Sequence, residues 1–386
     1  MIPYGRQNIS QEDIDAVIET LQSPFLTQGP KVPEFEKEIC SYTGGRFATA
    51  FNSATSALHA ACFALGLSKG DIFWTSPISF VASANCGLYC GASVDFVDVN
   101  PKSNNICPNE LEKKLIESKK NKTLPKVLIV VHLSGMPCEM KKIHALSVKY
   151  DFRIIEDASH AVGSEFEGKK TGNCEYSDIC IFSFHPVKII TTAEGGMAVT
   201  NSKEIHDSLT LHRTHGITKD ESKMSKTPDG PWYYEQKILG FNYRMTDIQA
   251  ALGISQLSKI DTFILKRRQI EKRYDQELSS LPIILPEKSN NALSSLHLYI
   301  IKIKLDQVSK SHKEIFTNLQ LKGIGVNLHY IPIYRQPYFA RYNFDQSQFL
   351  NSELYYSHAI SIPMHASMSS KDQDLVISAL KSIISI

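Results

Sequence analysis

Short apolar runs alternate with segments of helical periodicity over the first two-thirds of the chain. The runs are nearly continuous and rich in β-branched and aromatic residues, which is typical of strands that are buried on both faces. This pattern predicts a parallel sheet covered by helices on both sides. Strands are expected at 47–51, 71–76, 93–99, 126–133 and 152–157. Helices are expected at 10–21, 54–65, 80–90, 108–118 and 139–149, with a short one after Asp157.

The last third of the chain has a different pattern. Two long helical segments, 244–260 and 263–280, follow each other without an apolar run between them. Beyond them, a strand-like run at 296–305 is combined with further helical segments. This mixture predicts a smaller C-terminal α+β domain. We therefore expect a large domain over 1–259 and a small domain over 260–386.

Composition and charge narrow the function classes. Of the 386 residues, 42% are hydrophobic and 21% are charged, and the formal net charge is only +2. This balance gives no reason to expect nucleic acid or an acidic membrane as a partner. No signal peptide is visible, and no apolar run is long enough to span a bilayer. The eight cysteines lack metal-ligand spacing, so we expect reduced thiols, a cytoplasmic location and no metal site.

One segment resembles a phosphate-binding loop without completing it. Residues 163–172, GSEFEGKKTG, contain the spacing G-x-x-x-x-G-K, but Lys170 occupies the position where a serine or threonine would bind magnesium. The alternating polar and apolar residues of SEFEG favour a hairpin instead. We therefore expect a hairpin here and no nucleotide hydrolysis.

A lysine in an unusual context is the first candidate for chemistry. Lys188 lies in FSFHPVKIITTAEGG (182–196), among aromatic, aliphatic and small hydroxyl residues, with Ser183 nearby. Asp157 closes an expected strand, and ligands bind beyond the carboxyl ends of parallel strands. The turn NSATSALHA (52–60) could hold a phosphate at the start of a helix. Each feature alone has an ordinary explanation: a surface lysine, a capping aspartate and a capped helix.

Together, these features match the needs of pyridoxal phosphate. A lysine amine can form a Schiff base with the aldehyde, a carboxylate can keep the ring nitrogen protonated, and a helix start can hold the phosphate. Burial also lowers the pKa of a lysine, which makes the neutral amine accessible near neutral pH. The residues therefore predict a pyridoxal-phosphate enzyme.

Six motifs resemble, in the same order, those of the DegT-type sugar aminotransferases. They are LTQGPKVPEFE (26–36), NSATSAL (52–58), TSPISFVASAN (75–85), EDASHAVGSEFEGKKTG (156–172), FSFHPVKIITTAEGG (182–196) and NYRMTDIQAALG (242–253). The resemblance covers nearly the whole chain and implies pyridoxal 5′-phosphate as the cofactor. It also implies the α/β fold of type I pyridoxal-phosphate transferases, with a mostly parallel seven-stranded sheet between helices and a smaller C-terminal α+β domain.

Within this family, the motifs look most like enzymes of the pseudaminic acid pathway, which aminate C4 of a UDP-linked 4-keto-6-deoxy-N-acetyl sugar. The resemblance therefore implies a transaminase that uses L-glutamate and a UDP-4-ketosugar. Ketosugars of the perosamine, legionaminic acid or bacillosamine type stay open as substrates. A sugar dehydratase of the same family, in which histidine replaces the lysine, stays open as a second function. A non-catalytic sugar-binding or regulatory relative is a third.

The resemblance assigns roles by position. Lys188 is expected to bond the cofactor aldehyde and, once displaced, to act as general base and acid, while Asp157 is expected to contact the ring nitrogen. The other cofactor contacts that it implies are Phe80 over the ring, His160 near the ring hydroxyl, Thr55, Ser56 and Ser183 at the phosphate, and Asn242 at the phosphate from a second subunit. The implied sugar-pocket residues, for each of which core packing is equally open, are Tyr4, His329, Tyr330 and Tyr334. The role of Asn242 implies a homodimer with shared active sites.

Overall fold

The computed structural model describes residues 1–384 of the chain. Its largest element is a seven-stranded sheet with the order β1-β9-β8-β5-β4-β2-β3. β9 is antiparallel to both of its neighbours, and the remaining neighbouring strands are parallel. The expected mostly parallel seven-stranded sheet is therefore confirmed. The strands are β1 (Phe47–Phe51), β2 (Ile72–Thr75), β3 (Ser93–Phe96), β4 (Val127–Val131), β5 (Arg153–Asp157), β8 (Ile179–Ser183) and β9 (Gly196–Thr200).

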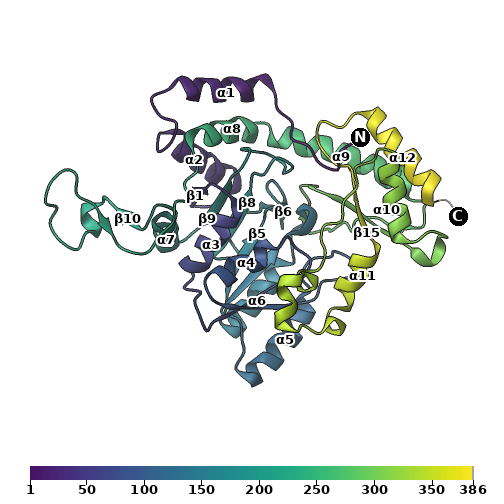
Figure 1. The fold of residues 1–386 in the computed structure, drawn as a ribbon, viewed down its shortest axis with the longest axis horizontal. Coiled ribbons are helices and arrows are strands. Elements are labelled where there is room, and N and C mark those ends of the chain that lie inside the picture. Colours follow the sequence, from purple (N-terminus) through teal and green to yellow (C-terminus); the bar gives the residue numbers. More distant parts are fainter. Residues whose placement is uncertain (385–386) are drawn as a thin grey trace.

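Helices cover both faces of this sheet (Figure 1). One face packs against α3 (Ala54–Ala64), α4 (Ala82–Tyr89) and α7 (Lys203–Arg213), and the other against α2 (Lys31–Thr43), α5 (Pro108–Asn121), α6 (Met140–Tyr150) and α8 (Asp247–Leu257). Successive side chains of a strand point to opposite faces. In β8, Ile181 therefore joins the core under α3, whereas Phe182 joins the core under α2 and α8. With both faces sealed, the ends of the strands are left for a ligand.

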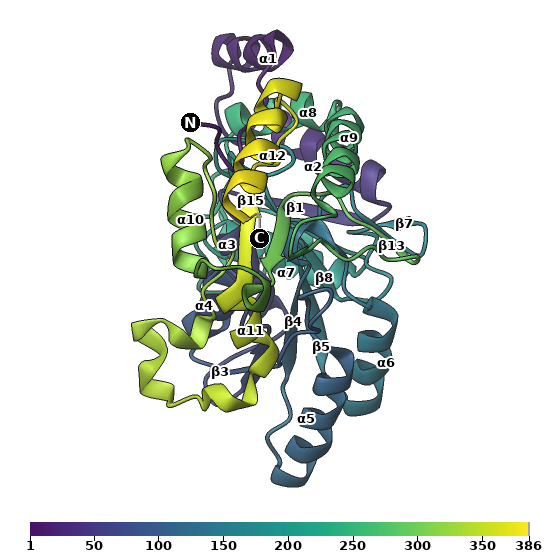
Figure 2. The same ribbon diagram turned by 90° about the vertical axis from the view of Figure 1, so that its right-hand side faces the viewer.

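A smaller sheet lies in the C-terminal part of the chain. It has the order β12 (Ile283–Ile284), β14 (Tyr299–Ile303) and β15 (Ala359–Ile362), and its neighbouring strands are antiparallel. Residues of α9 (Ile260–Leu278), α10 (His312–Leu321) and α12 (Ser370–Ile384) pack with it in a core of its own. Figure 2 shows α10 beside β15 and α12 above it, and the two helices contact each other. This part thus has the expected α+β character.

The expected domain boundary coincides with the start of a helix, because α9 begins at Ile260. Two segments nevertheless cross that boundary. Ile2 packs against the C-terminal core, and the segment before α11 (Leu350–His358) returns to the large sheet, where Phe349 lies near Phe96 of β3. The division at 259/260 therefore stays a prediction.

The segment after Asp157 differs from the expectation. Residues 158–163 form successive turns, so the prediction of a short helix there is wrong. The carboxylate of Asp157 accepts the N–H of Ser159 at 3.2 Å, which is the local bond by which aspartate competes with helix formation. The hairpin expected within 163–172 is confirmed, since β6 (Glu165–Phe166) pairs antiparallel with β7 (Lys169–Lys170).

Two segments project from the body of the molecule (Figure 1). One is the hairpin of β10 (Ile217–Thr218) and β11 (Glu235–Gln236), and the other is α1 (Gln11–Gln22), which packs on α8. Several apolar side chains of α1 stay exposed, including Leu21 at 54%. Within residues 1–384, none of the helices has the length and apolar character that a bilayer span requires.

Candidate active site

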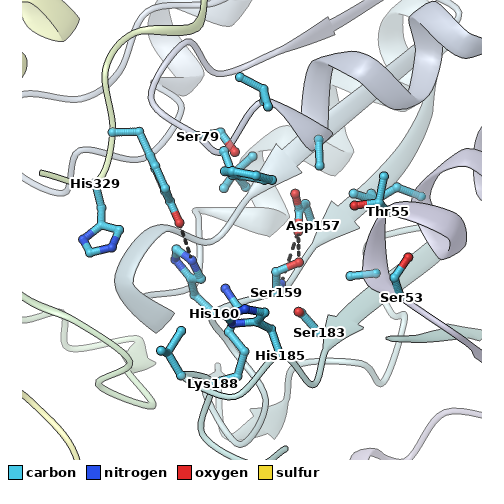
Figure 3. Close-up of a pocket in the computed structure, with 18 of the residues that line it drawn as sticks. Ser53, Thr55, Ser79, Asp157, Ser159, His160, Ser183, His185, Lys188 and His329 are labelled. Atoms are coloured by element: carbon cyan, nitrogen blue, oxygen red, sulfur yellow. Dashed lines mark hydrogen bonds between the residues drawn. The ribbon is translucent and has the colours of Figure 1, made fainter. Parts of the chain in front are cut away.

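A cavity of about 680 Å³ opens at the carboxyl ends of three parallel strands of the large sheet. Val131, Asp157 and Ser183, the last residues of β4, β5 and β8, all line it. The opposite wall comes from residues 327–331 in the C-terminal part of the chain. In Figure 3, Ser53 and Thr55 lie on one side of the cavity and His329 lies on the other. Open parallel sheets bind their ligands at this position.

Lys188 enters the cavity from the turn that follows β8. The turn is tight, because the N–H of Lys188 donates to the C=O of His185 at 2.9 Å. Burial lowers the pKa of Lys188 to about 8, and the carboxylate of Asp157 opposes this effect. An unperturbed lysine has a pKa of about 10.4, so Lys188 has a much larger share of neutral amine near neutral pH. Among residues 1–384, it is the only lysine or arginine that lines the cavity.

Asp157 is held by hydroxyl groups on both of its oxygens. Ser83 of α4 donates to Oδ2 at 2.6 Å, and Ser159 donates to Oδ1 at 2.6 Å. Because the single proton of Ser83 is used on Asp157, the 2.6 Å contact between Ser79 and Ser83 needs Ser79 as its donor. These bonds fix the direction of the carboxylate at the edge of the cavity.

The start of α3 forms the side of the cavity that lies across from His329 (Figure 3). Ser53 is the N-cap, and its Oγ accepts the N–H of Ser56 at 3.1 Å. The first amides of a helix lack intrahelical partners, so the turn at Ala54 and Thr55 favours an anion such as a phosphate. Gly196 of β9 lets the sheet approach this turn closely, because a Cβ there would lie 2.5 Å from the backbone nitrogen of Ala54.

The residues fit the cofactor expected from the sequence. A lysine with a lowered pKa, a carboxylate held by two hydroxyls and a helix start with hydroxyls surround one cavity. They would hold the aldehyde, the ring nitrogen and the phosphate of pyridoxal phosphate, respectively. Phe80 also lines the cavity and is 58% exposed, although it is a large aromatic residue.

The wall around His160 is aromatic and uncharged. His160 Nε2 lies 3.1 Å from the hydroxyl of Tyr330, and the dashed line at His160 in Figure 3 marks this bond. The rings of His160 and His297 lie 4.4 Å apart. Burial lowers the pKa of His329 to about 3, and the positive charge of Lys188 adds to this effect. His160 and His329 are therefore neutral imidazoles and do not add positive charge near Lys188.

The structure brings most of the expected site residues together. Those that line the cavity are Tyr4, Thr55, Phe80, Asp157, His160, Ser183, Lys188, His329 and Tyr330. Ser56 is not among the residues that line the cavity, and its hydroxyl lies 2.9 Å from Oγ of Ser53. Asn242 is exposed and pairs with Thr214 at an isolated β-bridge. Its expected role toward a second subunit stays a prediction.

Tyr334 does not occupy the place expected for it. Its hydroxyl donates to Glu353 at 2.8 Å, and its ring stacks on Phe349 at 4.7 Å, outside the cavity. The physical reason is its large apolar ring, which completes the core around Phe96. Core packing thus describes Tyr334 better than a place in the sugar pocket.

Several polar residues of the site were not singled out in the sequence. They are Ser53, Ser79, Ser83, Ser159 and Asn327. Ser53 could have been found from its position as the N-cap before a helix. Ser83 gives no such signal, because its partner Asp157 is 74 residues away in the sequence.

The family model for the DegT/DnrJ/EryC1/StrS aminotransferase family matches residues 7–381. The chain is 41% identical over 385 residues to the UDP-4-amino-4,6-dideoxy-N-acetyl-beta-L-altrosamine transaminase of Campylobacter jejuni, covering 100% of this chain and 98% of that protein. Its structure is similar to Helicobacter pylori PseC, an aminotransferase involved in the biosynthesis of pseudoaminic acid, with a TM-score of 0.91, 32% identity and 99% of both chains covered.

The PLP form of Spr1654 from Streptococcus pneumoniae has a TM-score of 0.88 and 27% identity, over 99% of this chain and 98% of that one. These similarities extend over the sheet, the cavity and the C-terminal part alike. The chain therefore belongs to the DegT/DnrJ/EryC1/StrS aminotransferase family.

Proposed function

We propose that this chain is a pyridoxal-phosphate transaminase that moves the amino group of L-glutamate to C4 of a UDP-linked 4-keto-6-deoxy-N-acetylhexosamine. The product would serve nucleotide-sugar biosynthesis of the pseudaminic acid type. One observation carries the proposal: Lys188 and Asp157 line one cavity in a chain that matches UDP-sugar transaminases over its whole length.

The cofactor's place follows from the residues around the cavity. Lys188 would bond its aldehyde, Asp157 would face its ring nitrogen, and Thr55, Ser183 and the start of α3 would hold its phosphate. When bound, pyridoxal phosphate supplies an aldehyde that accepts amino groups and a ring that accepts electrons from a breaking C–H bond.

Lys188 performs two tasks in this proposal. Its lowered pKa makes the neutral amine available for bonding. Once the amino donor has displaced it, Nζ is the base that removes a proton from the donor's carbon and the acid that returns one to the sugar carbon. The neutral imidazoles around it do not compete for this proton, because burial lowers the pKa of both His160 and His329.

Asp157 supports this chemistry through the position of its carboxylate. Its two hydroxyl partners, Ser83 and Ser159, hold the carboxylate in place, and Asp157 still lines the cavity. A carboxylate held in this way keeps a proton on a pyridine nitrogen. Without that proton, the ring accepts electrons less readily, so Asp157 is expected to control the rate of C–H cleavage.

A homodimer with shared active sites is part of the proposal. L-glutamate carries two carboxylates and a UDP-sugar carries a diphosphate, yet Lys188 is the only cationic side chain that one copy places on the cavity within residues 1–384. A second copy would supply further polar contacts, with exposed Asn242 reaching the phosphate. The exposed apolar face of α1 is a surface that such an assembly could cover. A chain that stayed monomeric and fully active would contradict this part.

A cytoplasmic location also belongs to the proposal. All eight cysteines are free thiols, as expected for a reducing compartment.

The rival functions predict different reactions. A dehydratase of the same family has histidine in place of the lysine, and here Lys188 occupies that place while His185 lines the cavity beside it. A non-catalytic sugar-binding relative would need no lysine with a lowered pKa. A different ketosugar stays the strongest rival within the transaminase class.

The deciding experiment is an assay of the purified protein with pyridoxal phosphate, L-glutamate and a panel of UDP- and dTDP-4-ketosugars. We expect 2-oxoglutarate and a 4-amino sugar in equal amounts, with the UDP-linked N-acetyl sugar preferred, as judged by mass and configuration of the product. Deoxygenation of the sugar without use of glutamate would favour the dehydratase. Binding of the sugar without any product would favour the regulatory relative.

A further inference from the structure

Both ring nitrogens of His160 are already bonded within the protein. The backbone N–H of Ser134 donates to Nδ1 at 3.2 Å, and Nε2 lies 3.1 Å from the hydroxyl of Tyr330. A neutral imidazole has one donor and one acceptor, so Nε2 carries the ring proton and donates it to Tyr330. Burial lowers the pKa of His160 and Lys188 lowers it further, which keeps the ring neutral. His160 therefore has no free nitrogen for a ligand.

Tyr330 is left with a free donor. Its oxygen accepts the bond from His160, so its own O–H is available on the side that lines the cavity. Burial raises the pKa of Tyr330, which keeps the phenol protonated. The ring is held between aromatic neighbours, with Phe80 at 6.1 Å and His329 at 5.1 Å between ring centroids. The donor is therefore fixed in direction before any substrate arrives.

The other polar groups on this wall have partners of their own. Nδ1 of His329 lies 2.8 Å from Oγ of Ser361, and its Nε2 lies 3.3 Å from the amide of Asn327. Tyr4 is a second phenol, and its ring lies 4.9 Å from that of His329. Tyr330 is hydrogen-bonded to His160, three residues beyond Asp157, so this phenol is connected directly to the segment that follows the end of β5.

We propose that Tyr330 donates a hydrogen bond to the ketone oxygen of the substrate, which nitrogen replaces during the reaction. In this proposal, His160 is a positioning residue that acts only through Tyr330. This inference rests on the proposed function, because it requires a keto substrate in the cavity. The resemblance places His160 near the cofactor's ring hydroxyl, whereas this inference concerns the oxygen of the substrate ketone and assigns its contact to the phenol.

The chemistry requires a donor at this oxygen. When nitrogen replaces the ketone oxygen, the C–O bond breaks as the C–N bond forms, and the oxygen leaves as water. The two protons of that water balance the two that the amine nitrogen loses, so Tyr330 ends with its own proton. A donor aimed at the carbonyl oxygen stabilises the negative charge that develops there. Proton removal from glutamate by Lys188 does not involve this oxygen.

The test compares two steps in the holoenzyme with the wild-type residue and with Tyr330→Phe. The first step is exchange of the Cα hydrogen of L-glutamate in D2O, and the second is amination of the UDP-4-ketosugar. We expect the exchange to stay within about twofold, whereas amination slows by about 100-fold. Loss of ¹⁸O from the labelled ketone into water should slow in parallel with amination. Tyr176→Phe, at a tyrosine outside the cavity that bonds Glu167, is the matched control and should change neither step.

Equal loss of both steps, or loss of neither, would overturn the inference. If the wild-type protein carried out neither step, the proposed function itself would fail, and this outcome differs from a selective effect of Tyr330→Phe.

A second pair of variants tests the role of His160 without altering the phenol. His160→Gln keeps one acceptor for Ser134 and one donor for Tyr330, so amination should stay within about threefold. His160→Leu removes both bonds and should slow amination by about tenfold with the glutamate exchange unchanged. The ¹⁵N spectrum of histidine-labelled holoenzyme should show the Nε2–H form for the signal that His160→Gln removes. An Nδ1–H form, or equal rates for the two variants, would refute the assignment.

Discussion

Glu156 and Asp157 are adjacent carboxylates at the end of β5, and their surroundings differ completely. Successive side chains of a strand point to opposite faces, so only one of the two can face the cavity. Glu156 lies 2.7 Å from Nε2 of buried His132 and also accepts from Ser177. Asp157 accepts from Ser83 and Ser159 and lines the cavity.

The two carboxylates differ in whether their hydrogen-bond partners leave them accessible from the cavity. Nδ1 of His132 accepts the N–H of Cys138, so Nε2 carries the ring proton toward Glu156 and the group is closed. The hydroxyls of Ser83 and Ser159 each donate to one oxygen of Asp157, and the side chain still lines the cavity. Burial is similar, at 6% and 5% exposure, so burial alone does not distinguish a structural carboxylate from a functional one. Access to the cavity distinguishes the functional carboxylate, Asp157, from the structural one, Glu156.

The largest expected effect comes from Lys188, the amine that lines the same cavity as Asp157. Lys188→Ala should reduce transamination by at least about 1,000-fold, because the same amine bonds the cofactor and carries the proton. The absorption band of the covalently attached cofactor should disappear as well. Lys203→Ala, at a surface lysine paired with Asp207, is the control and should change neither. Normal turnover by the Lys188 variant would end the assignment of this site.

Asp157→Asn keeps the shape of the side chain and removes its charge. We expect a loss of about 100-fold or more in amino transfer, because the ring nitrogen loses its anionic partner. The thermal midpoint should change little, and stopped-flow absorbance should locate the loss in the C–H cleavage step. Activity near that of the wild type would mean that the two carboxylates do not differ in function.

The pH dependence of pyridoxal phosphate uptake tests the effect of Asp157 on the pKa of Lys188. Because burial lowers the pKa of Lys188 to about 8, the neutral amine increases as pH rises through 8. The rate at which cofactor-free protein takes up pyridoxal phosphate should rise about fifty-fold between pH 6 and pH 8. Removing the charge of Asp157 should move this midpoint to lower pH, because that carboxylate favours the protonated amine. A midpoint that stays near 10 would show that Lys188 is not desolvated.

Removing the hydroxyl partner of Asp157 should weaken cofactor binding, whereas removing that of Glu156 should not. Ser83→Ala removes a 2.6 Å bond to Asp157 and should weaken cofactor binding by about tenfold, as expected for a hydrogen bond to a charged group. Ser177→Ala removes a bond to Glu156 and should leave cofactor affinity unchanged. Fluorescence titration with pyridoxal phosphate would measure both. Equal affinities for the two variants would contradict the view of Ser83 as a partner of the site.

Glu156→Gln should have the smallest effect on the activity of the folded enzyme, within about twofold. Its effect should fall on stability, with a loss of about 2 kcal/mol in the free energy of unfolding, because a charged acceptor buried against His132 is replaced by a neutral one. Denaturant titration and specific activity per folded molecule separate the two effects. A large loss of activity at unchanged stability would place Glu156 in the mechanism.

Much of the fold and the chemical centre could be predicted, because the signals are local. Buried strands such as β4 are continuous apolar runs, and α6 follows its strand with clear helical periodicity. Lys188 and Asp157 could be singled out because each lies at a strand end or turn that the pattern itself defines. The helix expected after Asp157 was wrong for a local reason as well, since the aspartate bonds the backbone of Ser159 instead.

Contacts between distant segments could not be predicted in this way. Ser83 and Asp157 are 74 residues apart, and His160 and Tyr330 are 170 residues apart. Tyr334 lies four residues after Tyr330 in a motif of similar composition, yet it packs in the core while Tyr330 lines the cavity. Sequence spacing alone does not show which of two tyrosines faces a cavity when neither lies in an α-helix or a strand.

By itself, the sequence determined which residue types are available and where many of the strands and helices lie, because hydrophobic periodicity and turn chemistry act over a few residues. It also determined the family, through motifs that are contiguous in the chain. Only the tertiary structure decided that Asp157 is open while Glu156 is closed, and that His160 has no free nitrogen while Tyr330 has a free donor. These properties depend on how hydrogen-bond donors and acceptors from distant segments are paired, and the pairing exists only after the segments pack together.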